Sequence, residues 1–181
     1  NKIAVVTGGS GGIGRCTAAS LKAAGFTVYE ISRRDIPSDG IIHMSADVTD
    51  ETQVRRVIDE IAEREGRIDI LVNNAGFGIS GAAELTESRD SHAQLELNVF
   101  GTDNVTRAVL PHMRAQGGGR IVCMSSIAGI VPIPFQLWYS VSKAAIIAYV
   151  LALQNEVRPF GISVCAIMPG DIASGFTDAR R

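Results

Sequence analysis

Short apolar runs alternate with amphipathic segments along the whole chain. Six of these runs have the length and apolar character of buried strands, and they cover residues 3–6, 27–31, 41–44, 70–72, 120–124 and 162–167. Helical patterns lie between most of them, at residues 15–24, 51–64, 91–115 and 139–157. Strands that alternate with helices predict an α/β fold, in which right-handed crossovers join a doubly wound parallel sheet.

A glycine-rich turn follows the first strand directly. Residues 7–14 read TGGSGGIG, and the first helical pattern begins at their end. Glycines let the backbone turn tightly and let a pyrophosphate come close, while a helix N-terminus offers free N–H groups. A glycine motif alone would fit a structural turn equally well. Between this strand and this helix, it predicts a nucleotide-binding site.

The residues after the second strand predict which coenzyme binds. In dinucleotide-binding domains an acidic residue at this point binds the ribose 2'-hydroxyl of NAD, whereas an arginine accommodates the 2'-phosphate of NADP. Ser32 stands in the place of the acid with Arg33 beside it, so NADP(H) is favoured over NAD(H). Glu30 and Asp35 are rival acids, but one lies within the strand and the other beyond two arginines. Solvated surface arginines would explain the pattern without a coenzyme.

Tyr139 and Lys143 are a candidate acid–base pair. They lie four residues apart at the start of the last helical segment, so both side chains leave the same face of the helix. A positive charge beside a phenol favours the phenolate, which makes proton exchange easier near neutral pH. Taken alone, so short a pattern more often marks the amphipathic start of a buried helix.

Polar residues also follow the fourth and fifth strands. Residues 73–76 read Asn-Asn-Ala-Gly, and two serines occupy positions 125–126. Ligands of open α/β sheets bind at the carboxyl ends of the strands, where both segments lie. Asn98 falls inside the predicted helix 91–115, where an asparagine usually faces solvent or bonds locally.

With these motifs in this order, the chain resembles the short-chain dehydrogenase/reductase family from Lys2 to about Phe176. The TGxxxGxG, NNAG and YxxxK motifs of that family match Thr7, Gly8, Gly12 and Gly14, residues 73–76, and Tyr139 with Lys143. The catalytic serine of the family resembles Ser126 more than Ser125, because it usually stands thirteen residues before the tyrosine. Asn98 falls where the family has a catalytic asparagine. The resemblance implies a Rossmann fold that binds NAD(P).

The resemblance also implies an activity, namely hydride transfer between NADP(H) and a secondary alcohol or ketone. Tyr139 would protonate the carbonyl oxygen, or act as the base in the reverse direction, and Lys143 would assist it and hold the nicotinamide ribose. Ser126 would position the substrate oxygen, and Asn98 would hold a water that links Lys143 to solvent. The alternative is a non-catalytic nucleotide-sensing or scaffold protein, which should lack at least one of the serine, tyrosine and lysine.

The implied coenzyme contacts are spread over the whole chain. Asp47 and Val48 resemble the adenine contacts, and the segment 169–172 resembles the one that closes on the nicotinamide. Ser174 stands where many relatives have a threonine. The complete set is Thr7, Gly8, Ser10, Gly12, Ile13, Gly14, Ser32, Arg33, Asp47, Val48, Asn73, Ala75, Gly76, Tyr139, Lys143, Pro169, Gly170, Ile172 and Ser174.

Two features depart from the family pattern. Many NADP-dependent relatives carry a basic residue where this chain has Gly11, so the prediction of NADP(H) rests mostly on Arg33. Relatives also continue into a substrate loop and a seventh strand, which are absent from this sequence. We therefore expect residues 1–181 to be a single NAD(P)-binding domain that is incomplete at its C-terminus. Without the seventh strand, the sixth would expose an apolar edge made of Ile162, Val164 and Ala166.

Composition and net charge indicate how many domains, which partners and which compartment to expect. A length of 181 residues suits one domain, and a net charge of -2 favours neither nucleic acid nor an anionic membrane as a partner. The longest apolar run, residues 144–153, is too short to span a bilayer. Three cysteines far apart in sequence indicate buried thiols in a reducing compartment, so we expect a soluble, cytoplasmic protein. The spacing of cysteines and histidines predicts no metal site.

Two apolar segments predict further contacts. Residues 144–153 are apolar around the whole circumference of a helix, so one face would pack on the sheet and the other on a second subunit, in a homodimer or homotetramer. Residues that flank the tyrosine would favour a substrate with an apolar body if they face the site; they are Ile133, Phe135, Leu137 and Trp138. Ordinary core or interface residues would explain them nearly as well.

Overall fold

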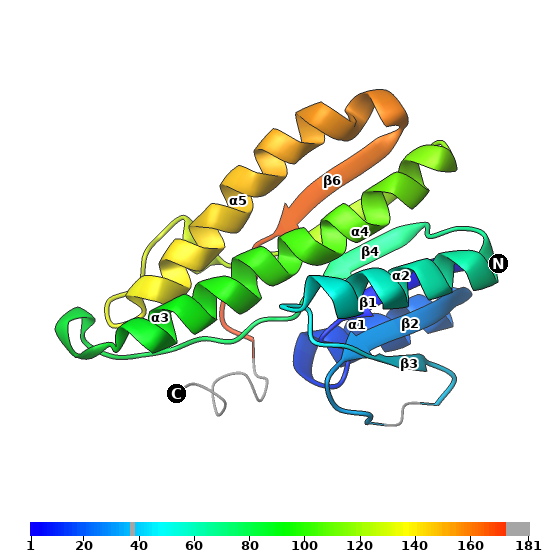
Figure 1. Ribbon diagram of the computed structural model, residues 1–181. Helices are drawn as coiled ribbons and strands as arrows, with labels where there is room; N and C mark the ends of the chain where they lie inside the picture. Colours follow the sequence, from blue (N-terminus) through cyan, green and yellow to red (C-terminus); the bar gives the residue numbers. More distant parts are fainter. Residues whose placement is uncertain (37–38, 173–181) are drawn as a thin grey trace.

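A computed structural model describes residues 1–36 and 39–172 of the chain. Six parallel strands form one sheet in the order β3-β2-β1-β4-β5-β6 (Figure 1). Their bounds are Lys2–Thr7 (β1), Phe26–Ser32 (β2), Ile42–Ser45 (β3), Ile70–Asn73 (β4), Gly119–Met124 (β5) and Ile162–Ile167 (β6). This order confirms the predicted doubly wound sheet. It also creates a crevice between β1 and β4, where the direction of winding reverses.

Helices cover both faces of the sheet (Figure 1). The longer ones are α1 (Gly12–Ala23), α2 (Glu51–Glu65), α3 (Ser88–Leu95), α4 (Gly101–Ala115) and α5 (Leu137–Val157). Short helical segments are η1 (Ala83–Leu85), η2 (Glu96–Phe100), η3 (Ile127–Gly129) and η4 (Arg158–Phe160). The larger apolar core joins α2, α4 and α5 to one face, and a smaller core joins α1 to the other.

Local sequence signals explain where α2 begins and ends. The Asp50 carboxylate accepts hydrogen bonds from the backbone N–H groups of Thr52 and Gln53, as the predicted cap should. Gly66 ends the helix in the left-handed conformation, with φ of 73°, which glycine adopts without a steric penalty. Both predicted boundaries of this helix are confirmed.

The predicted helix 91–115 differs from the structure. Its helical course begins earlier, at Ser88, and the segment Glu96–Phe100 forms a π-helical turn that separates α3 from α4. A π turn inserts one residue into the hydrogen-bond ladder, which a 3.6-residue apolar period does not reveal. Asn98 lies in this turn and is buried, so it does not face solvent as an asparagine within a helix usually does.

The prediction of an exposed apolar edge on β6 is also wrong. Ile162 and Val164 are only 3% and 4% exposed, because their side chains point to the sheet face that α5 covers. Strand side chains project above and below a sheet, so an unpaired edge exposes backbone and leaves the covered face buried. Cys165 and Ile167, which point to the other face, are exposed, and this overturns the expectation that all three cysteines are buried. Cys16 is exposed as well.

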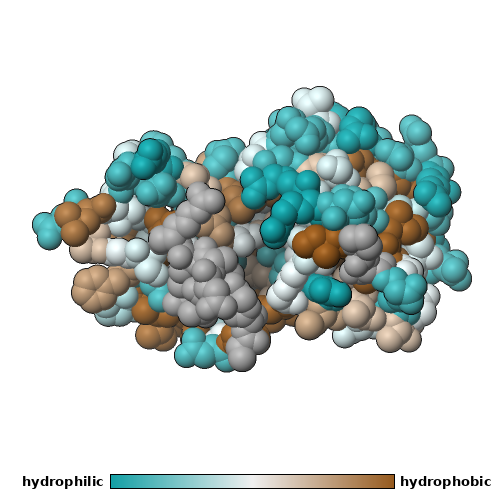
Figure 2. All heavy atoms as spheres, turned by 90° about the horizontal axis from the view of Figure 1, so that it is seen from below, coloured by the Kyte–Doolittle hydropathy of each residue, from teal (hydrophilic) through white to brown (hydrophobic). Residues whose placement is uncertain are grey.

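The helical stretch Leu137–Phe160 is, among the described residues, long and apolar enough to cross a membrane by length and composition alone. The central helix of a soluble protein meets the same criterion. Ile146, Val150 and Leu153 pack into the larger core beside β5 and β6, which is the arrangement of such a helix. Seen from below, the molecule carries brown apolar and teal polar side chains interspersed over its face (Figure 2).

Candidate active site

A cleft of about 490 Å³ lies at the carboxyl ends of the strands. It is the place that the strand order predicts for a ligand. Residues predicted from the sequence that line it are Gly8, Ser10, Gly12, Ile13, Ser32, Arg33, Asp47, Val48, Ala75, Gly76, Ser126, Tyr139, Lys143, Pro169, Gly170 and Ile172. Four other predicted residues stand behind its walls, namely Thr7, Gly14, Asn73 and Asn98. Ser174 lies outside the described residues.

The glycine turn is held against the end of β4. A Cβ atom at Gly14 would lie 2.3 Å from the Gly8 carbonyl oxygen and 2.4 Å from Asn74 Nδ2, so only glycine fits there. Thr7 Oγ1 accepts hydrogen bonds from the backbone N–H groups of Asn74 and Ala75, each at 3.0 Å. Thr7 and Gly14 therefore shape the cleft without lining it.

The first turn of α1 is open to a ligand. Gly11 caps this helix with no side-chain hydrogen bond, and a Cβ atom at Gly11 or Gly12 would meet nothing within 4 Å. The free N–H groups at this helix end and the space in front of them suit a phosphate. This arrangement fits the pyrophosphate of a dinucleotide.

The two asparagines at the carboxyl end of β4 point in directions that the sequence did not predict. The Asn73 side chain is buried and donates a hydrogen bond to Thr106 Oγ1 at 2.8 Å, away from the cleft. Asn74 lines the cleft instead, and its Nδ2 donates to the carbonyl oxygens of Thr7 and Gly8. The motif identified the correct segment, but the direction of each amide depends on the twist of the chain as β4 ends.

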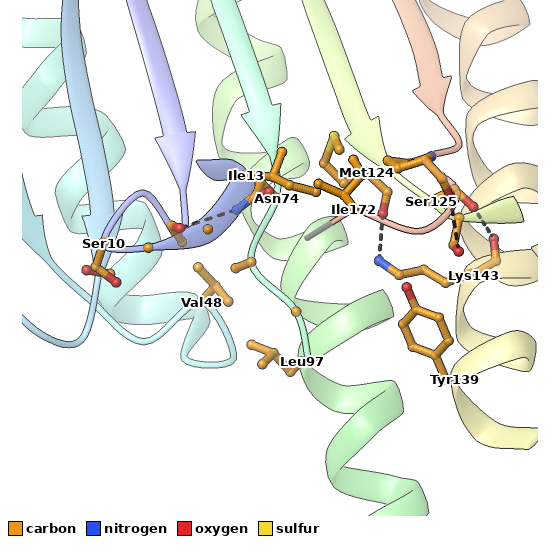
Figure 3. Close-up of a pocket in the computed structure, with 18 of the residues that line it drawn as sticks. Ser10, Ile13, Val48, Asn74, Leu97, Met124, Ser125, Tyr139, Lys143 and Ile172 are labelled. Atoms are coloured by element: carbon orange, nitrogen blue, oxygen red, sulfur yellow. Dashed lines mark hydrogen bonds between the residues drawn. The ribbon is translucent and has the colours of Figure 1, made fainter. Parts of the chain in front are cut away.

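Tyr139 and Lys143 leave the same face of α5 and point into one part of the cleft (Figure 3). Lys143 Nζ lies 5.7 Å from the centre of the Tyr139 ring and donates a hydrogen bond to the Met124 carbonyl oxygen at 2.7 Å. Burial lowers the pKa of Lys143 from 10.5 to about 8, because the charged form is desolvated. An ammonium with a lowered pKa beside a phenol is an arrangement for proton exchange.

The two serines after β5 divide into one structural and one available hydroxyl. Ser125 Oγ donates a buried hydrogen bond to the Lys143 carbonyl oxygen at 2.7 Å, which ties β5 to α5. Ser126 Oγ accepts from the Ala128 N–H at 3.2 Å and lies 3.5 Å from the Pro169 carbonyl oxygen. The weak second contact leaves Ser126 free to bond a substrate oxygen, and its position in the cleft agrees with the sequence prediction.

Asn98 connects three separate segments. Its Oδ1 accepts from the Phe77 N–H, and its Nδ2 donates to the Phe77 carbonyl oxygen and to Ser142 Oγ, each at 3.0 Å. Ser142 Oγ in turn donates to the Tyr139 carbonyl oxygen at 2.8 Å. Asn98 therefore positions the start of α5 relative to the loop after β4. Its expected role in holding a water stays a prediction.

Gln94 supports the loop after β4 from behind the cleft, a role that sequence reasoning missed. It is fully buried, and its Nε2 donates to the Phe77 carbonyl oxygen at 2.7 Å, the same oxygen that Asn98 contacts. The two amides lie four residues apart, and that spacing was the available signal. Apolar lining residues were missed as well, namely Leu97, Met124 and Ile127.

The model of the short-chain dehydrogenase family matches residues 2–181. The 3-ketodihydrosphingosine reductase of Bacteroides thetaiotaomicron is 44% identical over 181 residues, which are 99% of this chain and 67% of that protein. The chain belongs to the short-chain dehydrogenase/reductase family. It spans about two thirds of the length of that relative.

Solved structures of short-chain dehydrogenases share the fold. A 3-ketoacyl-(acyl-carrier-protein) reductase from Brucella melitensis, complexed with NADH, superposes with a TM-score of 0.94 at 27% identity over 99% of this chain and 80% of its own. A gluconate 5-dehydrogenase from Burkholderia cenocepacia, in complex with NADP and tartrate, gives 0.89 at 31% identity over 94% and 71%. The fold of this short-chain dehydrogenase is thus that of NAD(P)-linked oxidoreductases, and neighbours occur with either coenzyme.

The end of the cleft beyond the glycine turn carries the residues expected to distinguish the coenzymes. The Arg33 side chain is 74% exposed and forms an ion pair of 3.7 Å with Asp47 Oδ2. The rival acid Glu30 is 2% exposed and is not among the lining residues, so it cannot receive a ribose hydroxyl. Asp35 is exposed and does not line the cleft either.

Proposed function

We propose that this short-chain dehydrogenase transfers a hydride between NADP(H) and a secondary alcohol or ketone. The observation that carries the proposal is the convergence of Tyr139, Lys143 and Ser126 at one end of a cleft whose other end is an open helix N-terminus. When bound, the nicotinamide coenzyme supplies the hydride chemistry. A non-catalytic nucleotide sensor is less well supported, because all three polar groups are present and face the cleft.

The roles of the residues follow from their positions. Tyr139 donates its phenolic proton to the substrate oxygen during reduction and takes it back during oxidation. The Lys143 ammonium stabilises the phenolate that forms, and it does so in a poorly solvated place where charge interactions are strong. The Ser126 hydroxyl holds the substrate oxygen in reach of the Tyr139 hydroxyl.

A substitution at Tyr139 tests this assignment. Tyr139→Phe removes the exchangeable proton and keeps the ring, so NADPH should bind as tightly as to the wild type while turnover falls below detection. Coenzyme binding by fluorescence and ketone reduction at 340 nm measure the two effects. The matched control is Tyr149→Phe, at a tyrosine on the same helix whose hydroxyl hydrogen-bonds to Asp103. Turnover that survives in Tyr139→Phe would refute the mechanism.

The lining of the cleft supports a substrate with an apolar body. Among the apolar residues predicted to flank the tyrosine, Ile133 lines the cleft, whereas Phe135 and Leu137 are exposed outside it. Leu97 and Ile127 add to the apolar wall. The Bacteroides relative is a reductase of 3-ketodihydrosphingosine, and a ketone that carries a hydrocarbon chain is the substrate class we propose here. Reduction rates over a series of 3-keto compounds with chains of increasing length test it.

We also propose a cytoplasmic homodimer or homotetramer built on α5. One face of α5 is exposed and carries mainly apolar or small side chains, namely Leu137, Val141, Ala144, Ala148 and Leu151. Burying this stripe against a second copy would remove it from water. Light scattering on Leu151→Glu should then show a smaller assembly than the wild type, whereas Gln154→Glu, a polar residue on the same helix, should change little.

A further inference from the structure

Gln136 is a polar residue of the cleft that the proposed reaction does not use. It is partly buried and lines the cleft at the start of α5, three residues before Tyr139. Residues three apart are neighbours on one face of a helix, so Gln136 lies one turn beyond Tyr139, on the side away from Lys143. The three residues therefore follow one another along the same wall of the cleft.

The side-chain amide of Gln136 is available to a ligand. Gln136 stands at the N-cap of α5, but its side chain makes no capping hydrogen bond. Within residues 1–36 and 39–172, its amide has no hydrogen bond to any other residue. An amide can both donate and accept hydrogen bonds, so it can bind a hydroxyl group or a carbonyl oxygen of a substrate.

The backbone around Gln136 is held in place. Its N–H donates to the Ile133 carbonyl oxygen at 3.1 Å, and its carbonyl oxygen accepts from the Ser140 N–H at 2.9 Å. The Ile133 N–H donates to Ser140 Oγ at 3.2 Å. The Phe135 carbonyl oxygen accepts from the Gly81 N–H at 2.8 Å. A fixed backbone with an unused amide is the arrangement of a preformed site, in which a few polar groups orient the ligand.

The spacing along α5 indicates which part of a substrate would reach Gln136. Three residues of an α-helix rise about 4.5 Å along its axis. The ketone oxygen is proposed to lie at Tyr139 and Ser126, so a group bound by Gln136 would lie a few ångströms from that oxygen. A polar group on the second carbon from the carbonyl carbon fits this separation.

We propose that Gln136 is a specificity residue, whose amide binds a hydroxyl or carbonyl oxygen on the second carbon from the ketone carbon. The substrate class is then a ketone with a second polar group close to the reacting carbonyl, and not a ketone with hydrocarbon on both sides. The inference rests on the proposed function, which places the ketone oxygen at Tyr139. A site that hydrogen-bonds a substrate group discriminates against the analogue that lacks this group.

Two matched ketones, assayed with NADPH and with NADH, test the proposal. 1-Hydroxydecan-3-one and undecan-4-one have the same length, but the second has a methyl group in place of the hydroxyl group. Gln136→Met keeps the size of the side chain and removes the amide. It should lower kcat/KM for the hydroxyketone about tenfold, the effect of one hydrogen bond, and leave kcat/KM for undecan-4-one unchanged.

Gln154→Met is the matched control. Gln154 is an exposed glutamine on the same helix that does not line the cleft, so its replacement should change neither kcat/KM value. Urea unfolding should show both variants as stable as the wild type, because Gln136 makes no capping bond that could be lost.

Three results for Gln136→Met would overturn the proposal. They are an unchanged kcat/KM for the hydroxyketone, an equal fall for both ketones, and a ratio that changes only because undecan-4-one is reduced faster. A wild type that reduces neither ketone with either coenzyme would instead refute the proposed function on which the inference rests.

Discussion

The two ends of the cleft are built in different ways. At the end lined by Ser126, Tyr139 and Lys143, here called the catalytic end, Lys143 and Asn98 are 7% and 2% exposed, and hydrogen bonds from three separate segments hold them. At the end lined by Ser32 and Arg33, here called the adenosine end, the Arg33 side chain is 74% exposed, and the interaction found for its guanidinium is an ion pair of 3.7 Å with Asp47. A buried network allows little movement, whereas an exposed ion pair contributes at most about 1 kcal/mol.

This difference suggests a division of labour. Proton transfer needs atoms held within fractions of an ångström, and only packed, hydrogen-bonded side chains provide that. Recognition of a 2'-phosphate, which we propose for Arg33, needs a positive charge that is accessible from solvent, and an exposed arginine side chain can supply it. Substitutions at the catalytic end should therefore change kcat by large factors. Those at the adenosine end should change coenzyme affinity by smaller ones.

After Tyr139→Phe, the largest effect is expected for Lys143→Met. Methionine fills the buried space but removes the ammonium beside Tyr139, so kcat should fall about 10³-fold, within the range of general acid–base catalysis. Steady-state ketone reduction with saturating NADPH measures it. Lys22→Met, a partly exposed lysine on α1, is the control and should keep wild-type kcat. A fall of less than about tenfold in Lys143→Met would remove the contrast between the two ends.

The lowered pKa of the buried Lys143 should also appear in the pH dependence of the free energy of unfolding. Because burial lowers the Lys143 pKa from 10.5 to about 8, the unfolded chain binds more protons than the folded one between these pH values. The free energy of unfolding should thus rise with pH over that window, relative to Lys143→Met, by about 1 kcal/mol per pH unit and about 3 kcal/mol in all. Urea unfolding of both proteins from pH 7 to 10.5 measures the difference. Parallel curves would contradict a lowered pKa.

The serine pair sharpens the comparison within the catalytic end. Ser126→Ala should lower kcat/KM about 10²-fold, because the substrate oxygen loses a hydrogen bond in the transition state. Ser125→Ala should instead lower the free energy of unfolding by about 1–2 kcal/mol, since the Lys143 carbonyl oxygen loses its buried partner, with kcat changed only a few-fold. Steady-state kinetics and urea unfolding of both variants show which serine acts in catalysis and which one stabilises the fold. The opposite pattern would make Ser125 the catalytic serine.

The smallest effect is expected for Arg33→Ser. The KM for NADPH should rise about tenfold, while the KM for NADH and both kcat values stay near those of the wild type. Arg55→Ser, at an exposed arginine on α2 that pairs with Glu51, is the control. A kcat that falls along with NADPH affinity would show that the two ends of the cleft are not independent.

The sequence determined features that depend on spacing within one element. The alternation of strands and helices, the caps of α2 and the placement of Tyr139 and Lys143 on one helix face all follow from local periodicity. The resemblance to the family added Ser126, which the structure places in the cleft. These features could be predicted because each residue is compared only with its near neighbours in the chain.

Only the tertiary structure decided which groups from different elements meet. The π turn buries Asn98 against Phe77 and Ser142, Asn74 replaces Asn73 in the cleft, and the registration of β2 with β3 places Glu30 beside His43. Each of these contacts depends on how two elements are aligned and crossed. Local periodicity gives the direction of a side chain relative to its own helix or strand, but its partner is determined by the packing of the whole domain.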